Sequence, residues 1–169
     1  GIRTAVQTVT ARRLGQGLHK ESGMALRNGL ALATLYSLPT SLFVWKYSDS
    51  FARFFIEDPS ATPLTTDYVS IVFTGLLFSS YSFVFQGFFT GIEKTKIHMK
   101  VTVVSNVLNV YLNAGLIYGS SGVQEFFNEQ LSILSFLSYL WTWANFPALG
   151  VKGAAIGTLI SSFWMTAHY

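Results

Sequence analysis

Three asparagines recur along one apolar stretch of the chain, and their side chains are the ones best suited to chemistry. Asn106, Asn109 and Asn113 lie at positions i, i+3 and i+7, which places them on one face of a helix. Their amide oxygens can replace part of the water shell of a cation. A polar group inside an apolar helix is costly unless it has a partner. The three amides therefore predict either hydrogen bonds between helices or contact with a cation or substrate.

A second polar face lies near the start of the sequence, where Arg3, Gln7 and Thr10 share one side of a helix. If this helix reaches the cytoplasm near Arg12, then Arg3 lies about nine residues deeper, or ~13 Å at the rise of an α-helix. A guanidinium at that depth needs water or an acid. Arg3 is expected to line a hydrated cavity, to pair with an acid in a helix missing from this sequence, or to extend to the membrane surface. Arg3 and Gln7, with Asn106, are our candidates for the lining of a substrate cavity.

The composition indicates that these side chains belong to a membrane protein. Hydrophobic residues make up 50% of the chain and charged residues only 11%, whereas about a quarter of the residues in soluble domains are charged. The mean hydropathy is +0.41, and the chain contains 15 Phe, 8 Tyr and 4 Trp. Such an excess of apolar and aromatic surface suits lipid better than water. The chain lacks cysteine, which excludes disulfides and thiolate chemistry.

Runs without Asp, Glu, Lys or Arg divide the chain into segments of membrane length. A helix needs about 20 apolar residues to cross the ~30 Å hydrocarbon layer. Such runs predict three complete spans, at residues 26–45, 68–90 and 100–119. Two further segments, at residues 1–14 and 149–169, are expected to be spans shortened by the ends of the sequence. The predicted fold class is all-α, a polytopic transmembrane helix bundle in which residues 1–169 form part of a larger lobe.

The segment that follows the third predicted span has two interpretations. It is uncharged over residues 130–151, but Pro147 and Gly150 interrupt it and leave an apolar stretch that is short for a span. Tryptophan is favoured at the membrane surface, and Trp141 and Trp143 lie here. We expect residues 124–143 to form an interfacial helix, and an additional span is the alternative.

Positive charge predicts the orientation of the spans. Lys and Arg concentrate in the connections at 12–27 and 93–100, whereas those at 46–67 and 120–152 contain more acids than bases. Because Lys and Arg mark the cytoplasmic side, the first two connections are expected inside and the other two outside. This alternation requires that residues 124–143 do not cross the membrane.

The glycine spacing predicts close packing between helices. Gly87 and Gly91, and likewise Gly153 and Gly157, have the G-x-x-x-G spacing that lets helix backbones approach. The sequence does not contain the side chains of an enzyme. With only three histidines, it offers no histidine-glutamate metal spacing and no Ser-His-acid set. We expect no catalytic residues, no cofactor, no metal beyond a possible Na⁺ and no nucleic-acid partner.

Four motifs in order resemble the multidrug and toxic compound extrusion (MATE) family. They are TARRLGQG at 10–17 followed by ESGMA at 21–25, QGFFTGIEKT at 86–95, NVLNVYLNAGLIYG at 106–119, and FPALGVKGAAIGTLIS at 146–161. The resemblance implies helices two to six of the first six-helix lobe of a twelve-helix antiporter. Such antiporters, in the membrane of the cell or the bacterial inner membrane, expel small organic compounds against an inflow of Na⁺ or H⁺.

The resemblance also suggests a cation site. By motif alignment with members that hold such a site, Asn109 falls on its Asn position, Asn113 on its acid position and Thr158 on its Thr position. Asn113 departs from the pattern, because an amide cannot take a proton. An acid on the absent helix one would have to supply the charge. The connection at 120–147 is also longer than the family usually has.

Two other functions remain open at the level of sequence. A flippase for lipid-linked oligosaccharides, from the same superfamily, would share the fold, and Arg3 could suit its anionic substrate. A membrane-embedded enzyme is the alternative from another class. The expected partners are membrane lipid and small organic substrates, and function is expected to require the missing helix one and second lobe.

Overall fold

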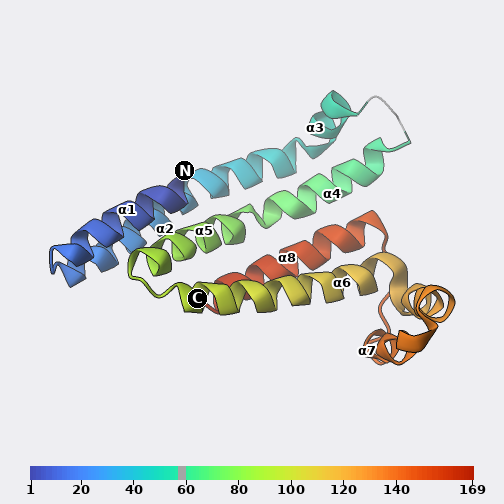
Figure 1. The fold of residues 1–169 in the computed structure, drawn as a ribbon. Coiled ribbons are helices and arrows are strands. Elements are labelled where there is room, and N and C mark those ends of the chain that lie inside the picture. The colour runs from blue at the N-terminus through green and yellow to red at the C-terminus, as the bar shows by residue number, and fades with distance from the viewer. Residues whose placement is uncertain (57–59) are drawn as a thin grey trace.

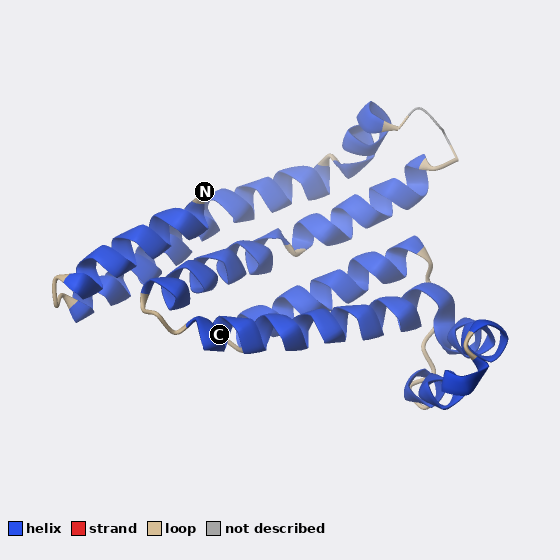
Figure 2. Ribbon diagram, in the orientation of Figure 1, coloured by secondary structure: helices blue, strands red, loops and turns tan. Residues whose placement is uncertain are grey.

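The computed structural model describes residues 1–56 and 60–169, and this part of the chain is helical without any strand (Figure 1, Figure 2). The all-α prediction is therefore confirmed. The elements are α1 (Ile2–Gly15), α2 (His19–Lys46), α3 (Ser48–Phe55), α4 (Thr62–Thr74), α5 (Leu76–Gly91), α6 (Thr95–Gln130), the 3-10 helix η1 (Ser132–Ser138), α7 (Tyr139–Thr142) and α8 (Val151–Ala167). Glu57 and Asp58, part of the acidic connection predicted outside, lie beyond the described residues.

The helices form an elongated bundle in which α4 and α5 run end to end through the middle (Figure 1). The α1–α2 hairpin packs against α5, and the α6–α8 pair lies on the other side. Val6, Ala33 and Val84 form one packed cluster of buried apolar side chains, at the contact of α1, α2 and α5. Other buried apolar residues, such as Leu116 and Ala155, lie elsewhere in the bundle. Large apolar side chains remain exposed over much of the surface, including Leu35 and Phe54, which is 82% exposed. Such a surface requires lipid or further helices to cover it.

The predicted span at 68–90 is interrupted in the structure. The chain bends by 42° between α4 and α5, at Gly75. The hydroxyl of Ser41, from α2, donates a hydrogen bond of 2.6 Å to the carbonyl of Phe73. A side chain inserted into the backbone ladder is a common cause of a helix kink. Here the Phe73 carbonyl also accepts from a backbone N–H at the end of α4. By length and hydropathy, α6 could cross a membrane, and α4 with α5 could form a second span if taken as one bent helix.

The predicted span at 100–119 is the straight part of a longer helix. Within α6, Gly119 adopts φ 73° and ψ 167°, a conformation open to glycine, and the chain turns there. The carbonyls of Leu116 and Ile117 lose their helical partners at this turn. They accept hydrogen bonds from the backbone N–H groups of Leu149 (2.8 Å) and Gly150 (3.2 Å), which leads the chain directly into α8.

Residues 124–143 do not form the single helix that we expected. The segment comprises the end of α6, η1 and α7, and its first break is at Leu131, with φ −136° and ψ 51°. Trp141 returns to α6, where its indole N–H donates to the carbonyl of Tyr111 at 2.8 Å. The hydroxyl of Ser120 donates to the carbonyl of Trp141 and accepts from the N–H of Phe146, both at 2.7 Å. These contacts bind the segment to α6, and its placement along a membrane surface stays a prediction.

Candidate functional site

Both glycine pairs lie where two helices come closest, as their spacing predicted. On α8, a Cβ added at Gly153 would lie 2.1 Å from the carbonyl oxygen of Leu116 on α6. On α5, a Cβ added at Gly87 would lie 2.4 Å from the carbonyl oxygen of Arg3 on α1, and one at Gly91 would lie 2.8 Å from that of Gln7. Side chains cannot occupy such distances, so the prediction of close packing is confirmed.

The α6–α8 contact contains two of the three asparagines. The side-chain amide of Asn113 donates to Oδ1 of Asn109 at 3.1 Å. Oδ1 of Asn113 lies against Gly157, where it would be 2.2 Å from an added Cβ. This oxygen is buried and has no hydrogen-bond partner among the described residues. An unpaired buried acceptor costs about 1–3 kcal/mol, so this carbonyl oxygen is an unusual feature of the α6–α8 contact.

Thr158 follows Gly157 directly, and its side chain is half-buried. Its hydroxyl donates to the carbonyl of Ala154 on the same helix, at 2.9 Å. A hydroxyl that gives its proton to the backbone still presents lone pairs to a cation. The structure thus brings Asn109, Asn113 and the Gly157–Thr158 backbone into one region, although no hydrogen bond joins the threonine to the amides.

Sequence reasoning missed two serines in the same interface. Ser105 lies one helical turn before Asn109, and its hydroxyl donates to the carbonyl of Ser161 at 3.0 Å. Ser161 in turn donates to the carbonyl of Gly157 at 2.7 Å. The four-residue spacing between Ser105 and Asn109 was the available signal, since it places both on one helix face.

Arg3 and Gln7 lie apart from the asparagines. Their backbone carbonyls face the α5 glycines, while the side chain of Arg3 is exposed. No ion pair is found for Arg3 among the residues that the structure describes, so the acidic partner that the sequence suggested is not within this part of the chain. The carbonyl of Arg3 faces Gly87, one turn before the end of α5. The α1–α2 hairpin extends beyond that end of α5 (Figure 1).

Asn106 is exposed and lies on another surface of the bundle. It borders a shallow groove formed by α6 and α7, together with Tyr111, Leu140 and Trp141. The backbones of α1 and α6 do not pack against each other within the described residues. Asn106 is therefore separate from the other two candidates for a substrate cavity, Arg3 and Gln7, which are neighbours on α1.

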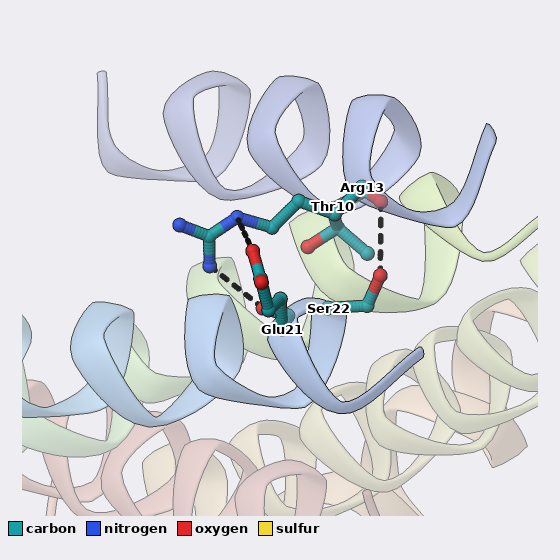
Figure 3. A network of polar contacts seen from close by, with 4 residues as sticks. All are labelled: Thr10, Arg13, Glu21 and Ser22. Carbon is teal, nitrogen blue, oxygen red and sulfur yellow. Dashed lines mark hydrogen bonds and ion pairs between the residues drawn. The ribbon is translucent and has the colours of Figure 1, made fainter. Parts of the chain in front are cut away.

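A polar network ties the end of α1 to the start of α2 (Figure 3). The guanidinium of Arg13 donates to the carbonyl of Glu21 at 2.7 Å and lies 3.7 Å from its carboxylate. The hydroxyl of Ser22 donates to the carbonyl of Thr10 at 3.2 Å. The first family motif thus has a structural role, since its Arg and Glu close the hairpin.

These features define a class of protein: part of a polytopic helical membrane protein, with polar groups buried between closely packed helices. The sequence profile of the MatE family matches residues 1–114. The chain therefore belongs to the MatE family, the multidrug and toxic compound extrusion transporters. Membership of a transporter family removes the membrane enzyme that the sequence left open.

Similar curated proteins bear one name, "Probable multidrug resistance protein NorM". The protein of Rhizobium meliloti (strain 1021) is 26% identical over 159 residues, which cover 94% of this chain and 29% of that protein. That of Photorhabdus laumondii is 32% identical over 109 residues, 63% of this chain and 24% of that protein. That of Synechocystis sp. is 22% identical over 165 residues, 98% and 30% respectively. The chain spans less than a third of the length of these relatives. No solved structure matches it significantly.

Proposed function

We propose that the whole protein is a secondary active transporter that exports small organic compounds in exchange for Na⁺ or H⁺. The observation that carries the proposal is the buried, unpaired Oδ1 of Asn113, next to Asn109 in the α6–α8 interface. The family and the name of the relatives support export of drug-like compounds. We propose the plasma membrane, or the inner membrane of a bacterium, as its location.

The cation site of this proposal consists of oxygen ligands from two helices. Asn113 contributes its free Oδ1, Asn109 the second lone pair of its Oδ1, and Thr158 its hydroxyl oxygen. These are hard ligands of the kind that cations such as Na⁺ prefer. Because none of the three side chains takes up a proton, a proton-driven cycle would place the proton on a group other than these three. Occupancy of the site drives transport only if it alters the relative stability of the inward- and outward-open states.

The substrate path is proposed to be lined by Arg3, Gln7 and Asn106. The separation of Asn106 on α6 from Arg3 and Gln7 on α1 is consistent with a path that the rest of the protein completes. The exposed and unpaired guanidinium of Arg3 would also suit an anionic substrate, which keeps the flippase as the alternative function. Export of a cationic dye, and no movement of a lipid-linked oligosaccharide, would decide between the two.

The substitution Asn109→Leu in the full-length protein tests the cation site. It removes the oxygen that accepts from Asn113 and fills its place with an apolar side chain of similar size. We expect ion-driven efflux in proteoliposomes to be lost, while expression and equilibrium binding of the substrate persist. Asn128→Leu, at an exposed position beyond the turn in α6, is the matched control and should export normally. Normal export by Asn109→Leu would show that the amides have only a structural role.

The proposed orientation can be tested separately. Residues 15–20 and 93–100 are proposed to be cytoplasmic and residues 48–66 external, because of their Lys and Arg content. Single cysteines at Lys96 and Ser60, in a protein otherwise free of cysteine, can be treated with an impermeant thiol reagent in intact cells. We expect labelling at position 60 only. The reverse pattern would invert the topology.

A further inference from the structure

Four polar side chains from three parts of the bundle meet near the connection between α5 and α6. The Nε2 atom of His98 lies 2.6 Å from Nε2 of Gln86 on α5. Its Nδ1 atom is hydrogen-bonded to the hydroxyl of Tyr169, just after α8, and lies 3.2 Å from the hydroxyl of Thr102. His98 thus joins α5, α6 and the end of α8, although its place in a charged connection suggested no chemistry from sequence alone.

Ring stacking holds the same residues together. The Tyr169 ring stacks on His98, with centroids 5.9 Å apart and planes 13° from parallel. Phe85 and Phe89 of α5 stack on Tyr169 at 5.3 and 5.7 Å. Stacked aromatic pairs stabilise a contact beyond the area that they bury. The end of α8 is therefore fixed to α5 and α6 by apolar stacking and by the hydrogen bonds of one imidazole.

The hydrogen bonds suit a neutral imidazole. A neutral histidine has one N–H donor and one acceptor nitrogen. The amide nitrogen of Gln86 donates to Nε2 of His98, and the proton on Nδ1 can be donated to the hydroxyl of Tyr169. Neutral His98 is fully satisfied in this arrangement.

The charges near His98 oppose its protonation. Burial lowers the pKa of His98 below the usual histidine value, and the positive charge of Arg3 on α1 lowers it further. On α6 itself, Lys96 and Lys100 are exposed neighbours, and α5 carries no acid or base other than Tyr81. His168 faces away, since its ring bonds the carbonyl of Trp164. No acid among the described residues makes a contact with this cluster that could offset a second positive charge.

We propose that His98 is a proton-binding site whose neutral form fastens the inner ends of α5, α6 and α8, and whose protonated form releases them. This rests on the proposed function, and it makes the proton a ligand of this lobe in addition to any cation at Asn109 and Asn113. Protonation places a cation beside Arg3 in a partly desolvated setting. Separation of α1 or of the end of α8 relieves that repulsion. Above the ordinary histidine pKa, His98 is neutral and the helices stay together. As the pH falls below that value, the fraction of molecules with these helices held together decreases.

A pair of nitroxide labels can report the separation of these helix ends. Thr95 and Ala167 are exposed positions at the start of α6 and the end of α8, on either side of His98 and Tyr169. In the full-length protein, with other cysteines replaced, dipolar broadening of the spectrum should be strong at about pH 7.5 and reduced at about pH 5. Because the labels report helix separation and not export, the test stays readable even if the protein transports nothing.

Three variants decide the role of His98. His98→Phe keeps an aromatic ring for stacking but removes the hydrogen bonds and the charge, so broadening should be weak at both pH values. His168→Phe is the matched control and should retain the full pH response. Arg3→Gln removes the repulsion that drives the helices apart, so the loss of broadening should become smaller and move to lower pH, which a merely structural histidine would not show. A wild-type spectrum that is independent of pH, or a His98→Phe spectrum that keeps the response, would overturn the proposal.

Discussion

The two glycine pairs have the same spacing but serve different interfaces. On α5, Gly87 and Gly91 both face backbone carbonyls of α1, at 2.4 and 2.8 Å from an added Cβ. On α8, Gly153 faces a backbone carbonyl of α6, whereas Gly157 faces the side-chain oxygen of Asn113. The spacing alone therefore sets how closely two helices approach. The group opposite each glycine decides whether the contact is only packing or also presents a polar atom.

Each interface also contains one buried oxygen without a partner among the described residues: Oγ1 of Thr10 near Gly91, and Oδ1 of Asn113 near Gly157. The threonine methyl group faces Gly91, at 3.0 Å from an added Cβ, so α5 receives an apolar group. The asparagine instead turns its carbonyl oxygen toward α8. The α1–α5 interface thus tolerates a spare hydroxyl, whereas the α6–α8 interface directs an acceptor into the space between helices.

The largest effect is expected where glycine faces backbone. Gly153→Ala would place a Cβ 2.1 Å from the carbonyl of Leu116, which cannot move without displacing α6. Overpacking costs about 1–3 kcal/mol and sometimes more, and we expect the high end here, with a strong fall in the thermal unfolding midpoint of the full-length protein in detergent. Gly23→Ala is the control, because nothing lies within 4 Å of its added Cβ. Equal midpoints for both variants would contradict the close approach of α6 and α8.

An intermediate effect is expected at Gly157, where the opposing atom belongs to a side chain. Gly157→Ala should displace the carboxamide of Asn113, lower stability by about 1 kcal/mol and weaken ion-driven efflux. Gly91→Ala meets the backbone of Gln7 at 2.8 Å, so it should lower stability at least as much.

A second substitution distinguishes Gly157, which faces a side chain, from Gly91, which faces the backbone of Gln7. Adding Asn113→Ala to Gly157→Ala should recover most of the lost stability, because the clashing atoms are gone, but it should not recover efflux. A double-mutant cycle of unfolding midpoints measures this coupling. Strictly additive effects would show that Gly157 and Asn113 do not contact each other.

The packing partners of glycines could be predicted from sequence in part. The spacing of Gly153 and Gly157 shows that a helix approaches closely, and the structure confirms it. What spacing could not provide is the angle at which α8 crosses α6. That crossing makes Asn113 half-buried and leaves Asn106 exposed, although both share one helix face in projection.

Two breaks in helices could not be predicted for a related reason. The bend at Gly75 is accompanied by a hydrogen bond from Ser41, a residue distant in sequence, to the Phe73 carbonyl. The turn at Gly119 depends on a positive φ that only one glycine within α6 adopts, and its freed carbonyls are satisfied by Leu149 and Gly150. Local composition identifies apolar runs, but contacts between distant segments decide where a run stops being one helix.

The smallest effect is expected at Thr10, where a substitution tests directly whether the α1–α5 interface differs from the α6–α8 interface. Thr10 is fully buried, and its hydroxyl has no partner among the described residues, while its backbone carbonyl accepts from Ser22 (Figure 3). Thr10→Val keeps the shape and removes a buried polar group that makes no hydrogen bond, so stability should stay level or rise by up to about 1 kcal/mol. Efflux should not change. The corresponding Asn113→Leu should abolish ion coupling, because it removes the acceptor that faces α8. A Thr10→Val protein that folds normally but cannot export would show that the α1–α5 interface also uses its unpaired oxygen, and the distinction between the two glycine pairs would fail.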